Sequence, residues 1–114
     1  MTLGFKEQFA ELILTGRKQC SIRQDPNKRW NVGKSIQFYS YSRTKKKKKI
    51  REDGICKKIS EITIIPFDRQ VRINENYLTE LEIDYLSFAN GFESVDLFFE
   101  YFNNPIVNAT LIEW

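Results

Sequence analysis

The sequence predicts an α+β fold, a small β-barrel of mixed or antiparallel strands with helices packed on its outside. The expected elements follow the order helix, several strands, two helices and a closing strand, without internal repeats and without strict alternation of strand and helix. This order is typical of α+β folds, because parallel doubly wound sheets require strands and helices to alternate. The length of 114 residues predicts a single domain over residues 1–114.

The first helix is expected over about residues 5–15, where phenylalanine, leucine and isoleucine recur at helical spacing. Gly16 is placed to end this helix, because glycine readily adopts the left-handed conformation that follows many helices. The next segment, CSIR over 20–23, is expected to form a short strand.

The middle of the chain predicts further strands. Apolar and polar residues alternate over 35–42, which places Ile36 and Phe38 on the inward face of a strand. A long strand is expected over 55–67 and a shorter one over 69–74.

The last part of the chain predicts two helices and a closing strand. Residues 76–92 are expected to be helical in part, and 106–114 alternate again as a strand does. Ser94 is a suitable N-cap for the second of these helices. The apolar face of that helix is formed by Val95, Phe98, Phe99 and Phe102.

Charge is distributed unevenly along the chain. The net charge is only +3, but residues 17–58 carry 15 Lys and Arg against three acids. Residues 59–114 carry two Arg against ten acids. This segregation predicts a basic face that attracts a polyanion.

The composition excludes several kinds of site. The chain has no histidine, which rules out Ser–His and Cys–His catalysis and argues against a structural zinc site. Cys20 and Cys56 belong to no CxxC pair and are expected to be small buried apolar residues. We therefore expect no metal and no cofactor. No run of about 18 apolar residues exists and the N-terminus is unlike a signal peptide, so we expect a cytoplasmic protein without membrane contact.

The segment GRKQCSIR resembles the GxKxxxxR signature of the ASCH domain, a PUA-like β-barrel. Gly16, Lys18 and Arg23 occupy its fixed positions. Other features agree with the same family along nearly the whole chain: Trp30 with Gly33-Lys34 before a strand, Arg43-Thr44-Lys45 after it, Asn90-Gly91-Phe92 in place of the usual DGF, and a final strand ending at Trp114.

The resemblance implies a role with RNA. In this family a cleft lined by the signature is proposed to take a nucleotide or an RNA segment. One branch removes the acetyl group from acetylcytidine with a lysine, a threonine and a glutamate. Lys18 and Ser21 fall on the lysine and the threonine, whereas the nearest match for the acid is Asn90, which has no carboxylate. Glu61 or Glu93 could supply an acid from elsewhere in the chain.

We therefore expect RNA or nucleotide binding without catalysis. Lys18, Ser21 and Arg23 are expected to grip a phosphate or a base edge in the cleft, and Arg43 and Lys45 to add contacts at the neighbouring strand end. One alternative is an amidohydrolase acting on acetylcytidine-type nucleosides, with Lys18 and Ser21 as catalytic residues and no identified acid. Another is an interaction module whose basic face docks on an acidic protein partner.

Some features keep two interpretations. Residues 18 and 21 point to opposite faces of a regular strand, so both line one cleft only if the chain bends between them. The lysine run 45–49 is either a self-repelling loop or an arm that follows a phosphate backbone. Trp30, Tyr39 and Tyr41 either pack in the protein or stack on unpaired bases.

Overall fold

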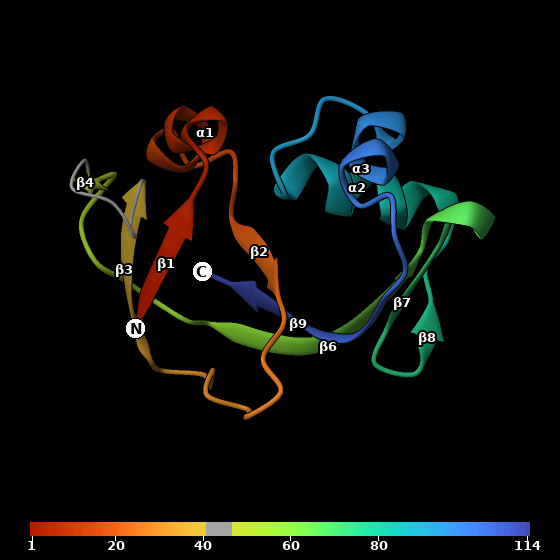
Figure 1. The fold of residues 1–114 in the computed structure, drawn as a ribbon, viewed down its shortest axis with the longest axis horizontal. Helices are drawn as coiled ribbons and strands as arrows, with labels where there is room; N and C mark the ends of the chain where they lie inside the picture. The colour runs from red at the N-terminus through yellow and green to blue at the C-terminus, as the bar shows by residue number, and fades with distance from the viewer. Residues whose placement is uncertain (41–46) are drawn as a thin grey trace.

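The structure is a computed structural model and describes residues 1–40 and 47–114. It has the predicted α+β composition, with strands in two sheets and helices beside them (Figure 1). The helices are α1 (Ala10–Leu14), α2 (Glu80–Ala89) and α3 (Val95–Tyr101). The strands are β1 (Thr2–Phe5), β2 (Cys20–Arg23), β3 (Ser35–Ser40), β4 (Lys48–Lys49), β5 (Gly54–Ile55), β6 (Lys58–Ile65), β7 (Gln70–Ile73), β8 (Asn76–Tyr77) and β9 (Ile106–Glu113).

The strands divide between two sheets. In the first sheet β1 runs parallel to β3, and β4 and β5 both pair with β3 in antiparallel fashion. The second sheet has the order β2-β9-β6-β7-β8 and is antiparallel throughout. Among the described residues, backbone pairing does not close these sheets into one barrel.

A bend between β5 and β6 carries the chain from the first sheet to the second. On the first-sheet side, Cys56 N–H donates to the Lys34 carbonyl at 2.8 Å. One residue later, Lys57 N–H donates to the Glu113 carbonyl of β9, also at 2.8 Å. The opposite margins are formed by β1 and β2, which are edge strands of their sheets over the described part of the chain. We call the gap between β1 and β2 the seam.

The core lies between the sheets and under the helices. Ile36 and Phe38 are both 0% exposed, which confirms the inward face predicted for β3. The Phe38 ring stacks on Phe5 of β1 with centroids 6.3 Å apart and meets Trp114 edge to face at 5.0 Å. Phe38 therefore joins both sheets through a single aromatic cluster.

The prediction for residues 5–15 is wrong at its start. Thr2–Phe5 form a strand, a 3-10 turn covers Glu7–Phe9, and the α-helix is confined to Ala10–Leu14. Leu3 and Phe5 are buried at every second residue, which is the period of a strand, and this short pattern is hidden by the helical spacing that follows it. Gly16 has a φ of +82°, which confirms its expected place at the helix end.

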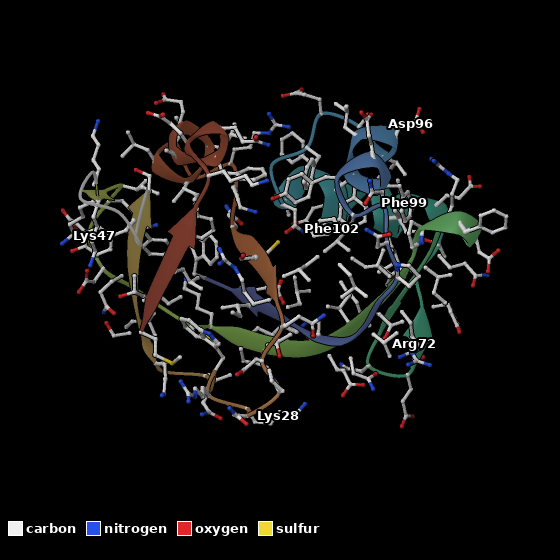
Figure 2. All side chains as sticks on the ribbon, in the orientation of Figure 1. Lys28, Lys47, Arg72, Asp96, Phe99 and Phe102 are labelled. Carbon is white, nitrogen blue, oxygen red and sulfur yellow. The ribbon has the colours of Figure 1, made fainter. Side chains whose placement is uncertain are left out.

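The other predicted strands and helices are confirmed with small changes. The strand expected over 55–67 is interrupted by the bend after β5, and β6 ends at Ile65. In α3 Phe98 and Phe99 are buried while Asp96 points outward, as Figure 2 shows for Phe99 and Asp96. Ser94 caps this helix as predicted, since its Oγ accepts from the Leu97 N–H at 3.1 Å.

The N-terminus of α2 gives a stability prediction. The Thr79 hydroxyl accepts from the Glu82 N–H at 3.2 Å, and the Glu82 carboxylate accepts from the Thr79 N–H at 2.9 Å. Thr79→Ala should lower the free energy of unfolding by about 1 kcal/mol, because it removes the acceptor of a capping box. Urea unfolding measures the change. Thr79→Ser keeps the acceptor oxygen and should retain most of the stability; equal losses for both variants would show that the cap is not the cause.

Candidate functional site

A hollow of about 290 Å³ opens at the seam, where β1 and β2 lie closest to the ends of α2 and α3. Its wall combines aromatic rings with cationic groups and a few neutral polar groups. It is lined by Gly4, Phe5, Lys6, Phe9, Lys18, Ser21, Ile22, Arg23, Asn90, Phe92, Tyr101 and Phe102. The structure thus brings the predicted Lys18, Ser21 and Arg23 into one cavity.

The chain bends between α1 and β2. Residues 18 and 21 can therefore line one cleft, although they would point to opposite faces of a regular strand. Lys18 N–H donates to the Leu12 carbonyl, and Gln19 N–H donates to the Ala89 carbonyl, each at 2.9 Å. β2 begins only at Cys20, so Lys18 does not follow the strand's alternation. Lys18 and Ser21 consequently line the same hollow.

Lys18 carries a buried amine, with the residue only 5% exposed. Its Nζ donates to the main-chain carbonyl of Asn90 at 2.7 Å and lies 4.8 Å from the centre of the Phe9 ring. Burial is the main cause that lowers the Lys18 pKa from 10.5 to about 8; the interaction with Cys20 acts in the opposite direction, and the charge of Arg23 acts in the same direction as burial. At pH 7 about a tenth of this amine is therefore uncharged, which is still far more than for an ordinary lysine.

Arg23 bridges the seam. Its Nε donates to the Ser21 Oγ at 2.8 Å, and its Nη2 donates to the Gly4 carbonyl of β1 at 2.7 Å. The guanidinium also lies 4.8 Å from the centre of the Phe5 ring. Burial lowers the pKa of Arg23. These contacts hold Ser21 and Arg23 as one unit that connects the edge strands of the two sheets.

Asn90 supplies a main-chain oxygen to the site. The residue ends α2 and is 1% exposed, and its Nδ2 donates back to the Leu86 carbonyl at 3.1 Å. Gly91 follows with a φ of +95°, and a Cβ on it would lie 3.1 Å from Leu12 Cδ1 and 3.4 Å from Lys18 Cδ. A residue with a side chain here would strain the backbone and press on the lysine stem.

Among the described residues that line the hollow, none is an aspartate or a glutamate. Glu61 is exposed on β6, where its N–H donates to the Asn74 side chain, and it does not line the hollow. Glu93 lies outside as well and pairs with Arg17 at 2.6 Å. The structure therefore places neither candidate acid beside the Lys18 amine.

A second hollow of about 720 Å³ adjoins the first and shares part of its wall. Glu93 and Glu100 lie on its wall, together with Lys6, whose Nζ is 5.1 Å from the centre of the Tyr101 ring. Sequence reasoning missed the contribution of Lys6, Phe9 and Tyr101 to the site. Their separation along the chain leaves no local pattern that could have grouped them.

Trp30 and Tyr39 are not among the residues that line the hollow. Arg43 and Lys45 fall outside the described residues, as does Tyr41. Trp30 is 7% exposed and packs in the core, so its stacking on bases is excluded by burial. Lys47 lies over the Tyr39 ring, with Nζ 4.2 Å from the centre. Figure 2 shows Lys28 and Lys47 at separate places on the surface.

Comparison with protein-family models, curated proteins and solved structures gives no match. Over the described residues, no helix is long and apolar enough to span a membrane. The same part of the chain contains no cluster of His, Cys, Asp and Glu that could hold a metal ion.

Proposed function

We propose that this chain is an ASCH domain of PUA-like fold that binds RNA or a nucleotide in the hollow at the seam, in the cytoplasm and without catalysis. The observation that carries the proposal is the convergence of Lys18, Ser21 and Arg23 on one cavity. Lys18 and Arg23 occupy fixed positions of the signature that the sequence resembles, and Ser21 lies between them. All three line one cavity because the chain bends between α1 and β2.

The barrel is part of this proposal. The sheets are joined by the bend between β5 and β6 on one side and by the Arg23 bridge to Gly4 on the other. A PUA-like barrel with one open seam would have this arrangement, and its cleft would coincide with the hollow.

The wall of the hollow suits a nucleotide. Rings of Phe5, Phe9 and Tyr101 offer surfaces on which an unpaired base can stack, and stacking of this kind contributes about 1–3 kcal/mol per base. Lys18 and Arg23 offer donors to a phosphate or to a base edge. The volume of about 290 Å³ is near the lower end of small-molecule sites, about 300–1,000 Å³, so it fits one nucleotide unit rather than a duplex.

An amidohydrolase is the second candidate, and one observation favours it. The Lys18 amine, with a pKa of about 8, shares the hollow with the Ser21 hydroxyl, as a base and a nucleophile would. Amide hydrolysis also needs an acid to protonate the leaving amine. Asn90 has no titratable proton for this purpose, and the carboxylates Glu61 and Glu93 lie elsewhere, which is why we favour binding.

Loss of the Lys18 amine should weaken RNA binding. Lys18→Met keeps an apolar chain of similar length and removes the donor, so the dissociation constant for a single-stranded RNA should rise at least about tenfold, the loss of one charged hydrogen bond. Lys57→Ala removes the same charge from an exposed position in the basic segment and should change affinity less than about threefold. Fluorescence anisotropy with a labelled oligonucleotide, at several salt concentrations, measures both.

Contrary results would separate the candidates. Absence of RNA and nucleotide binding at low salt would reject the proposal and favour the module that docks on an acidic protein. Conversion of acetylcytidine to cytidine, followed by chromatography and lost in both Lys18→Met and Ser21→Ala, would instead establish the amidohydrolase.

A further inference from the structure

The Lys18 amine lies in surroundings that favour its uncharged form and leave space beside it. The residue is 5% exposed, its nearest rings are Phe9 and Phe5, and its hydrogen-bond acceptor is a neutral main-chain carbonyl. The hollow of about 290 Å³ begins at this side chain. Desolvation of this kind makes a lysine amine easier to deprotonate and so favours its use as a nucleophile.

Among the described residues that line the hollow with Lys18, no carboxylate is present to act as a counter-ion. From β2, Lys18 faces the cationic Arg23 and the Cys20 thiol, whose pKa burial raises to about 12. Lys6, which follows β1, and the Tyr101 phenol of α3 also line the hollow. A desolvated lysine beside a second cation is a recognised arrangement for activating an amine toward carbonyl compounds.

We propose that Lys18 is a covalent capture site that forms an imine with a small aromatic aldehyde held in the hollow. The Nζ lone pair attacks the carbonyl carbon, and the C=O π electrons move to the oxygen. A proton passes from nitrogen to oxygen to give the carbinolamine. Water then leaves as the C=N bond forms, so that one amine and one aldehyde give one imine and one water, with no oxidant or reductant.

The lining residues define the aldehyde. The rings of Phe5, Phe9 and Phe92 suit a flat apolar body. Arg23 uses Nε and Nη2 for Ser21 and Gly4, and over the described residues its Nη1 has no hydrogen-bond partner. That nitrogen can receive an anionic substituent, so the preferred ligand is an aromatic aldehyde that carries a carboxylate.

The lowered pKa of the Lys18 amine agrees with its buried position beside Arg23. With its pKa lowered from 10.5 to about 8, the uncharged fraction at pH 7 exceeds that of an ordinary lysine by on the order of 100-fold. The exposed lysines of the same chain provide internal references, because they react with the same reagent in the same tube.

The test uses the intact protein, 4-carboxybenzaldehyde in limiting amount at pH 7, and cyanoborohydride to reduce any imine to a stable secondary amine. Peptide mass spectrometry then gives the rate of labelling at each lysine. We expect Lys18 to be labelled at least tenfold faster than exposed Lys57. Equal or slower labelling of Lys18 overturns the proposal, and this comparison requires no variant that could misfold.

Further measurements follow the same reaction. The labelling rate at Lys18 should level off above about pH 8, the pKa of its amine, and a rate that keeps rising well above that pH would count against the proposal. The methyl ester of the probe should label Lys18 more slowly than the acid does, and equal rates would reject the role given to Arg23. None of these results depends on RNA binding, so the two proposals can fail separately.

Discussion

Phe38→Ala is expected to lower the free energy of unfolding by about 4 kcal/mol, in the range found for large aromatic residues truncated in a core. Phe38 is 0% exposed and contacts both sheets, through Phe5 and through Trp114. Its surroundings are tight, since a Cβ on Gly54 would lie 2.9 Å from the ring. Because small domains are stable by only about 5–15 kcal/mol, this loss would be severe.

Urea unfolding followed by tryptophan fluorescence measures the effect of Phe38→Ala. Phe67→Ala provides the matched control, because Phe67 is 97% exposed and should change stability by less than about 0.5 kcal/mol. Similar losses for both variants would mean that Phe38 does not join the sheets in the way described.

The buried amine of Lys18 should make stability depend on pH in alkaline solution. Its pKa is about 8 in the folded protein against 10.5 for an ordinary lysine. Below pH 8 the amine is charged in both states and the cost of burying the charge is fully present. Between these values only the unfolded chain holds the proton, so stability rises with pH, in total by about 3 kcal/mol.

Lys18→Met isolates this contribution, because it removes the titrating group and keeps the apolar stem. Other groups titrate in the same range, including Cys20 and Cys56, whose raised pKa values act in the opposite direction. The quantity to measure is therefore the difference in unfolding free energy between wild type and Lys18→Met, at pH 7 and pH 10. We expect it to move in favour of wild type by 2–3 kcal/mol. A constant difference would show that the amine is not desolvated.

The sequence predicted most elements because their patterns are local. β3 alternates, α3 carries a capping serine, and Gly16 ends α1; each signal acts within a few residues. β1 was missed because only Leu3 and Phe5 show its period, and its stability comes from pairing with β3, more than thirty residues away.

The apolar residues on the exposed face of α2 show a second limit of predicting structure from apolar spacing. This helix buries Ile83 and Leu86, yet Leu81 and Tyr85 are 79% and 75% exposed. Apolar residues therefore lie on both of its faces, and spacing alone does not say which face meets the sheet. Only the tertiary contacts decide it.

The sequence predicted the part of the candidate site that lies between Lys18 and Arg23, but not the residues that distant segments contribute. Lys18, Ser21 and Arg23 lie within one short segment, and their grouping needed only the bend before β2. Phe9 reaches the hollow from the 3-10 turn before α1, Asn90 from the end of α2 and Tyr101 from the end of α3. The Asn90 contact is made by a main-chain oxygen, which no residue type can signal.

The Arg23 bridge has a mechanical consequence. At the seam Arg23 gives a described side-chain hydrogen bond from one sheet to the other, since it donates to the Gly4 carbonyl. Loss of that guanidinium would break this bond with every strand ladder intact, while the packing of Phe5 and Phe38 against Trp114 would still join the two sheets.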